Sequence, residues 1–170
     1  MEIKKLNTFL GKENEFKNSI FLGGTCGVST WREELASNLQ FEENDVILVD
    51  PRVEDYIYER DSVLEEIAKD NCKAVVCGIT NTVNTASIYS FVETSWLAAK
   101  GKNIIVYCNL SEFEDGPVKK SIKNSLSFFV LKGVKIVQTI NELAKTIINI
   151  NKQKRPPKMV GEISAPPTLG

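Results

Sequence analysis

The chain has 170 residues, 42% of them hydrophobic and 25% charged, and its formal net charge is -1. This length suits one globular domain with a substantial core, and the near-neutral charge excludes proteins that hold nucleic acid or anionic membranes through an overall positive field. No apolar run reaches the roughly 20 residues of a membrane-spanning helix, and residues 1–7 lack the apolar core of a signal peptide. We therefore expect a cytoplasmic protein that binds neither membrane nor nucleic acid.

Histidine is absent, and the four cysteines form no C-x-x-C pair: Cys26, Cys72, Cys77 and Cys108. Without histidine the chain cannot build Ser-His or Cys-His nucleophile pairs, and most zinc sites are excluded. Three of the cysteines lie in or beside apolar runs, where cysteine commonly behaves as a small hydrophobic residue. We expect free thiols, and any chemistry must use carboxylates, hydroxyls, thiols, lysine or arginine.

Apolar runs typical of buried strands alternate with helical patterns along most of the chain. The predicted strands are 19–22, 46–49, 74–79, 103–108 and 134–137, and the predicted helices are 31–39, one from Asp61, 87–100, 117–132 and 140–150. This alternation predicts parallel strands joined by right-handed crossovers. We expect one doubly wound α/β domain over residues 19–150, with a five-stranded sheet in flavodoxin-like order, an N-terminal extension at 1–18 and a Pro-rich tail at 151–170.

Ligands of open parallel sheets bind beyond the carboxyl ends of the strands. The loop from Gly23 to Thr30 leaves the first predicted strand there, and its small residues allow backbone amides to approach a phosphate or a sugar. It lacks the lysine of a P-loop and the spacing of G-x-G-x-x-G. The alternative is an ordinary tight turn between strand and helix.

Glu93 is the sharpest candidate for chemistry, because its helix neighbours are mostly apolar or small. Such an acid is either a first-turn partner of the helix dipole or a functional group in a partly desolvated pocket. Glu65, Glu66 and Asp61 lie on the preceding predicted helix, where one of them can complete a carboxylate pair, unless they form a solvated face. Arg32 and Arg52 are candidate phosphate ligands, while Trp31 and Tyr89 offer faces on which a base could stack.

Four stretches together resemble the nucleoside 2-deoxyribosyltransferase-like superfamily. They are Ile20-Phe21-Leu22-Gly23-Gly24-Thr25, Ser29-Thr30-Trp31-Arg32, Val49-Asp50-Pro51-Arg52, and Glu93 followed by Ala98-Ala99-Lys100-Gly101-Lys102. The resemblance covers roughly residues 19–110. The superfamily includes deoxynucleoside monophosphate N-glycosidases and is more distantly related to TIR domains.

The resemblance implies that Glu93 attacks the anomeric carbon of a sugar and that Glu66 assists the departing base, with Glu65 and Asp61 as alternatives. It implies a substrate site containing Gly23, Gly24, Thr25, Cys26, Trp31, Arg32, Asp50, Arg52 and Tyr89. It also implies a homo-oligomer, a nucleoside or nucleotide ligand, and no cofactor or metal. The chain departs from the family's Gly-flanked G-x-E-L-G context, since it has Phe91-Val92-Glu93-Thr94-Ser95, and from the acid usually found just before the third strand, around Lys73-Ala74.

The predicted function is N-glycosidic bond cleavage or deoxyribosyl transfer through a glutamate nucleophile. A catalytically silent nucleotide-binding or signal-sequestering domain and a TIR-like NAD hydrolase are the alternatives. Catalysis requires Glu93 and a second carboxylate within about 5 to 9 Å, the range in which paired carboxylates flank a glycosidic bond.

Overall fold

A single six-stranded parallel sheet forms the centre of the computed structural model, which describes residues 2–26, 29–40, 46–81 and 88–152. The strands are β1 (Glu2–Lys5), β2 (Ser19–Gly24), β3 (Ile47–Asp50), β4 (Ala74–Gly78), β5 (Ile104–Tyr107) and β6 (Lys135–Val137). They lie in the order β1-β3-β2-β4-β5-β6, and every neighbouring pair is parallel. The five predicted strands therefore have the expected flavodoxin-like order.

The sixth strand, β1, was not predicted. It lies within residues 1–18, the predicted N-terminal extension, and it pairs with β3 at the edge of the sheet. Its sequence is Glu2-Ile3-Lys4-Lys5, and edge strands often carry charges that prevent further pairing. A four-residue strand of this composition has no apolar run, so hydrophobic patterning does not reveal it.

The helices alternate with the strands as the sequence pattern predicts. They are α1 (Trp31–Gln40), α2 (Tyr58–Asn71), α3 (Ile88–Ala99), α4 (Pro117–Leu131) and α5 (Ile140–Lys152), with short 3-10 turns η1 (Leu6–Phe9), η2 (Glu13–Asn18) and η3 (Leu110–Glu112). Helix α2 begins three residues earlier than predicted, and α5 continues to Lys152. The predicted tail beyond that helix lies outside the described residues.

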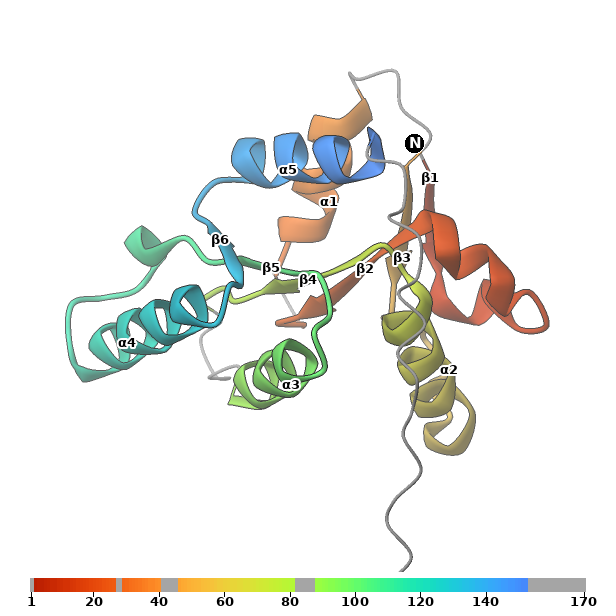
Figure 1. Cartoon of the computed structure of the whole chain (residues 1–170), viewed down its shortest axis with the longest axis horizontal. Helices are drawn as coiled ribbons and strands as arrows, with labels where there is room; N and C mark the ends of the chain where they lie inside the picture. Colours follow the sequence, from red (N-terminus) through yellow and green to blue (C-terminus); the bar gives the residue numbers. More distant parts are fainter. Residues whose placement is uncertain (1, 27–28, 41–45, 82–87, 153–170) are drawn as a thin grey trace, which may run out of the picture.

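Helices cover both faces of the sheet, with α1 and α5 on one side and α2, α3 and α4 on the other (Figure 1). Alternate strand residues divide between two apolar clusters: Phe21, Val75 and Val106 face the α2–α4 side, whereas Ile20, Val76 and Ile105 face α1 and α5. This is the two-layer cover that a parallel sheet needs, because both of its faces are apolar. In the described part of the chain, no helix has both the length and the apolar character to cross a membrane.

Candidate functional site

The loop after β2 begins where the backbones of two strands come very close. Gly24 is paired with Gly78 of β4 and has a φ of 101°, a backbone conformation that favours glycine. Beyond it, the Thr25 amide donates to the Gly78 carbonyl at 2.7 Å, and the Thr25 hydroxyl accepts from the Thr80 amide at 3.2 Å. The two loops that follow β2 and β4 are therefore joined at the carboxyl edge of the sheet.

Replacing Gly24 with alanine is expected to destabilise the fold by about 3 kcal/mol or more, because a Cβ there would overlap the backbone nitrogen and oxygen of Gly78 and the φ is unfavourable. The matched control is Gly116→Ala, since Gly116 has open space around its Cβ position and an extended φ. We expect that control to cost less than about 1 kcal/mol. Urea unfolding measures both, and equal losses would contradict the close approach.

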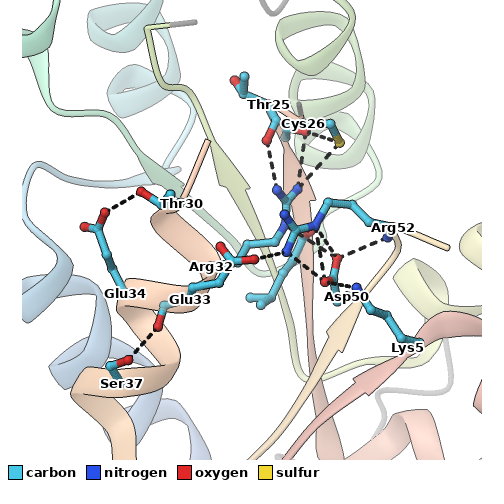
Figure 2. A network of polar contacts seen from close by, with 12 residues as sticks. Lys5, Thr25, Cys26, Thr30, Arg32, Glu33, Glu34, Ser37, Asp50 and Arg52 are labelled. Carbon is cyan, nitrogen blue, oxygen red and sulfur yellow. Dashed lines mark hydrogen bonds and ion pairs between the residues drawn. The ribbon is translucent and has the colours of Figure 1, made fainter. Parts of the chain in front are cut away.

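Arg32 is buried and binds the backbone of the Gly23–Cys26 loop rather than facing a pocket (Figure 2). Its guanidinium donates to the carbonyls of Leu22 at 3.0 Å, Thr25 at 2.9 Å and Gly24 at 3.4 Å. Burial lowers the pKa of Arg32 from its usual value, although charges nearby partly oppose this. Because the donors are used within the protein, Arg32 shapes the loop and is poorly suited to bind phosphate.

Asp50, at the end of β3, binds the two other cations of this network, Lys5 and Arg52 (Figure 2). It accepts from Lys5 at 2.7 Å and from Arg52 at 2.9 to 3.2 Å, while Arg52 also reaches Glu33 at 2.6 Å. Burial alone would raise the pKa of Asp50, but hydrogen bonds from Arg52 and Lys5 outweigh it and hold the pKa below its ordinary value. The candidate phosphate ligands Arg32 and Arg52 are thus both committed to internal partners.

A second polar cluster surrounds the ammonium of Lys69, whose side chain is only 2% exposed. Its Nζ lies 2.5 Å from Glu93 Oε1, 3.3 Å from Glu65 Oε2 and 3.3 Å from Glu66 Oε1. Because all three oxygens contact the same ammonium, the Glu93 oxygen lies within about 6 Å of the Glu65 oxygen. The same limit holds for the Glu93 and Glu66 oxygens. Glu93 therefore has the expected second carboxylate beside it.

The other oxygen of Glu93 lies close to the end of β2. Its Oε2 lies 3.7 Å from where a Cβ on Gly23 would be placed, and Gly23 is paired with Cys77 of β4. One oxygen of the carboxylate thus contacts Lys69 while the other lies at the carboxyl end of the central strands. The Gly23-Gly24 turn therefore lies between the two polar clusters: Gly23 is close to Glu93, and the Gly24 carbonyl accepts a hydrogen bond from Arg32.

Glu65 differs from Glu66 in its surroundings. Its side chain is 22% exposed against 55% for Glu66. Burial raises the pKa of Glu65 above its ordinary value; the Lys69 ammonium opposes this rise without cancelling it, and the charge of Glu93 adds to it. The hydroxyl of Tyr56 lies near Glu65, and burial and the Glu65 charge raise the pKa of that tyrosine.

An open pocket of about 520 Å³ lies beside this cluster and reaches from α2 to α3. Its lining includes Glu65, Glu66 and Lys69 together with three tyrosines, Tyr56, Tyr58 and Tyr89. Tyr89, a predicted substrate residue, is 74% exposed there. The pocket thus combines carboxylates with aromatic faces large enough to contact a nucleobase.

The remaining candidates lie elsewhere. Asp61 accepts from the Ile57 amide at 2.7 Å and from Arg60 at 2.8 Å, so it stabilises the start of α2. Trp31 is buried against Gly78, and its ring centroid lies 6.0 Å from that of Tyr107, which places it in the core.

Glu93 lies in the second turn of the described helix α3, so it is not the first-turn partner of the helix dipole that the sequence left as an alternative.

The cysteines are free thiols, as expected. Burial raises the pKa of Cys77 to about 11 and that of Cys108 to about 12, which keeps both protonated and unreactive. Cys26 is exposed, and its Sγ lies 3.4 Å from the Gly24 carbonyl and 4.0 Å from Arg32. It belongs to the loop network described for Arg32.

Lys69 is the residue that sequence reasoning missed. It follows Glu65 by four residues and Glu66 by three, the spacings at which side chains on one helix face meet. That spacing was a usable signal, but it normally marks an exposed ion pair. Only the approach of Glu93 from α3 identifies Lys69 as the buried centre of a three-carboxylate cluster.

The comparisons with known proteins concern the family and the fold of the chain. A family model described as "Nucleoside 2-deoxyribosyltransferase like" matches residues 17–111, which include β2, α2, β4, α3 and β5. Among solved structures, a conserved protein from Enterococcus faecalis V583 has a TM-score of 0.53 and 12% sequence identity, over 76% of this chain and 96% of that protein. That likeness concerns the fold alone. No curated protein sequence matches the chain.

Proposed function

Because this chain belongs to the nucleoside 2-deoxyribosyltransferase-like family, we propose that it cleaves the N-glycosidic bond of a nucleoside or nucleotide and passes the sugar to water or to another base. Family membership supports a nucleoside-related or glycosyl-transfer function. The observation that carries the finer proposal is the convergence of Glu93 and Glu65 on one buried ammonium beside an open pocket.

In this proposal Glu93 is the nucleophile. Its Oε1 is held by Lys69, so Oε2 attacks the anomeric carbon while the bond to the base breaks and its electron pair moves to the base nitrogen. The product is a glycosyl ester of Glu93, which water or a second base then cleaves. Cleavage of an N-glycoside passes through a positively charged sugar, which the carboxylates of the cluster stabilise.

Glu65 is the better candidate for the acid that protonates a neutral departing base. A general acid must hold its proton near the working pH, and the raised pKa of Glu65 favours that state. Glu66, the second carboxylate suggested by family spacing, is more exposed. A carboxyl group whose pKa is raised by its surroundings, as that of Glu65 is, suits the acid role in such a pair.

The pH dependence of base release follows from this assignment. Since the acid acts only when protonated, kcat/KM for a neutral base should fall as pH rises through the raised pKa of Glu65. Glu65→Gln should remove this descending limb and slow the reaction by about 100-fold or more. Glu66→Gln is the comparison variant, and a limb that disappears in it instead would assign the acid role to Glu66.

The direct test of the proposed function is a panel of substrates followed by chromatography of the released base. Deoxynucleosides, ribonucleosides, their monophosphates and NAD are each incubated with the full chain, alone and with a second free base. Base release supports hydrolysis, and base exchange supports transfer. Release from NAD alone would favour the TIR-like alternative, whereas nucleotide binding without release of any base would favour a silent binding domain.

A further inference from the structure

The Lys69 cluster, which lies beside the pocket between α2 and α3 and supplies Glu65, Glu66 and Lys69 to its lining, carries excess negative charge. Three carboxylates, those of Glu65, Glu66 and Glu93, surround the single ammonium of Lys69, which leaves two uncompensated charges when all four groups are ionised. The side chains of Lys69 and Glu93 are largely buried, at 2% and 14% exposure. Charges in such surroundings are screened less by salt than charges on an open surface.

Few groups near the pocket can bind an anion. Among its described lining residues Lys69 is the only cation, and its ammonium already contacts three carboxylates. Asp70, which also lines the pocket, is paired with Lys102 at 3.0 Å and with Lys100 at 4.0 Å, so these two lysines already have a carboxylate partner. Arg32 and Arg52 bind the β2 loop and Asp50 instead. A phosphate in this pocket would meet carboxylates without a free cation.

The aromatic lining has the opposite preference. Tyr56, Tyr58 and Tyr89 are 45%, 73% and 74% exposed, so their rings are available to a ligand. The face of an aromatic ring attracts cations, and flat heteroaromatic cations also stack on it. Tyrosine rings beside uncompensated carboxylates therefore favour a positively charged planar group.

We propose that this pocket takes an unphosphorylated nucleoside whose base is a heteroaromatic cation, such as an N-glycosylated pyridinium. The inference rests on the proposed function and names its substrate class. Attack by Glu93 on the anomeric carbon breaks the bond to the cationic ring nitrogen, and the electron pair of that bond neutralises the ring. The base leaves as a neutral molecule without receiving a proton, and water then cleaves the glycosyl ester to the free sugar, the Glu93 carboxylate and one proton.

This chemistry separates the roles of the two acids. A neutral base needs a proton as it leaves, whereas a cationic base does not. Glu65→Gln should therefore slow release of a neutral base strongly and slow release of a cationic base by only a few-fold. Equal losses for both bases would contradict the proposed substrate class.

Three probes that share one ring test the recognition step: nicotinamide riboside, its neutral dihydro form, and nicotinamide mononucleotide, which adds a 5′-phosphate. Their dissociation constants are measured by calorimetry on the full chain, both in the parent protein and in Glu93→Gln, at low and at moderate salt. In the parent protein the cation should bind about tenfold more tightly than its neutral form and than the phosphorylated probe. The preference should be smaller in Glu93→Gln, which removes one of the three carboxylates. Raising the salt concentration should reduce this preference only slightly, because salt screens largely buried charges less than exposed ones.

Glu66→Gln should reduce the preference for the cation several-fold, because it removes one carboxylate of the pocket. Glu114→Gln, at an exposed loop position, is the matched control and should not change it. Equal affinities for the three probes, or tightest binding of the phosphorylated one, would overturn the inference. Base release from neutral nucleosides with no preference for the cation would overturn it while leaving the proposed function standing. A clear preference without release of any base would instead overturn the proposed function.

Discussion

Replacing Glu93 with glutamine is expected to lower the rate of base release at least about 1,000-fold, because the amide is a poor nucleophile and cannot form the glycosyl ester. The substitution keeps the shape of the side chain, and Lys69 retains Glu65 and Glu66 as partners, so the protein should still fold. Released base is measured by chromatography, using the best substrate of the panel. Circular dichroism checks the fold of the variant.

Glu114→Gln is the control for Glu93→Gln, since Glu114 is an exposed residue of the loop before α4. It should leave the rate unchanged. A second measurement detects the intermediate directly: rapid acid quenching during turnover, followed by mass spectrometry, should find the sugar attached to the peptide that contains Glu93. Base release that survives in Glu93→Gln would remove this residue from the nucleophile role.

Replacing Lys69 with methionine is expected to lower the free energy of unfolding by about 3 to 5 kcal/mol at pH 7, because it leaves partly buried carboxylates without their shared cation. The loss should shrink as pH falls toward 4. Without the ammonium, which opposes the rise, the pKa of Glu65 rises further in the folded state, so folding then takes up a proton. Chemical unfolding at pH 7 and at pH 4.5 measures both effects.

Lys119→Met is the matched control for Lys69→Met. Lys119 pairs with Asp115 at 2.8 Å, but Asp115 is 96% exposed. Exposed pairs of this kind contribute little, so the control should cost less than about 0.5 kcal/mol at either pH. If the two lysine variants lose the same stability, the Lys69 cluster is not the buried ion-pair centre described here.

The behaviour of the two arginines shows a limit of residue-type reasoning. The sequence places Arg32 and Arg52 after the first two predicted strands, where arginine often binds phosphate, and that interpretation was reasonable from position alone. In the folded protein their donors are directed to the carbonyls of the loop and to Asp50. Which partner a guanidinium meets depends on segments distant in sequence, so residue type and spacing do not determine it.

The sequence alone determined the fold class, the order of the five main strands, the family resemblance and the helices that carry Glu93, Glu65 and Glu66. These features follow from the apolar periodicity of each segment and from the handedness of parallel crossovers, and both depend mainly on residues that are close in sequence. Strand β1 was not predicted from the sequence, because a short, charged edge strand has no such apolar periodicity. The tertiary structure decided the rest.

Only folding brings α3 beside α2, so that Glu93 meets Lys69 and the two carboxylates of the preceding helix. The charge and burial of that cluster depend on a contact between Lys69 and Glu93, which are more than 20 positions apart in the sequence. The exposure that distinguishes Glu65 from Glu66 depends on how α2 packs. Those long-range contacts turn a glutamate with apolar neighbours into a candidate nucleophile paired with a candidate acid.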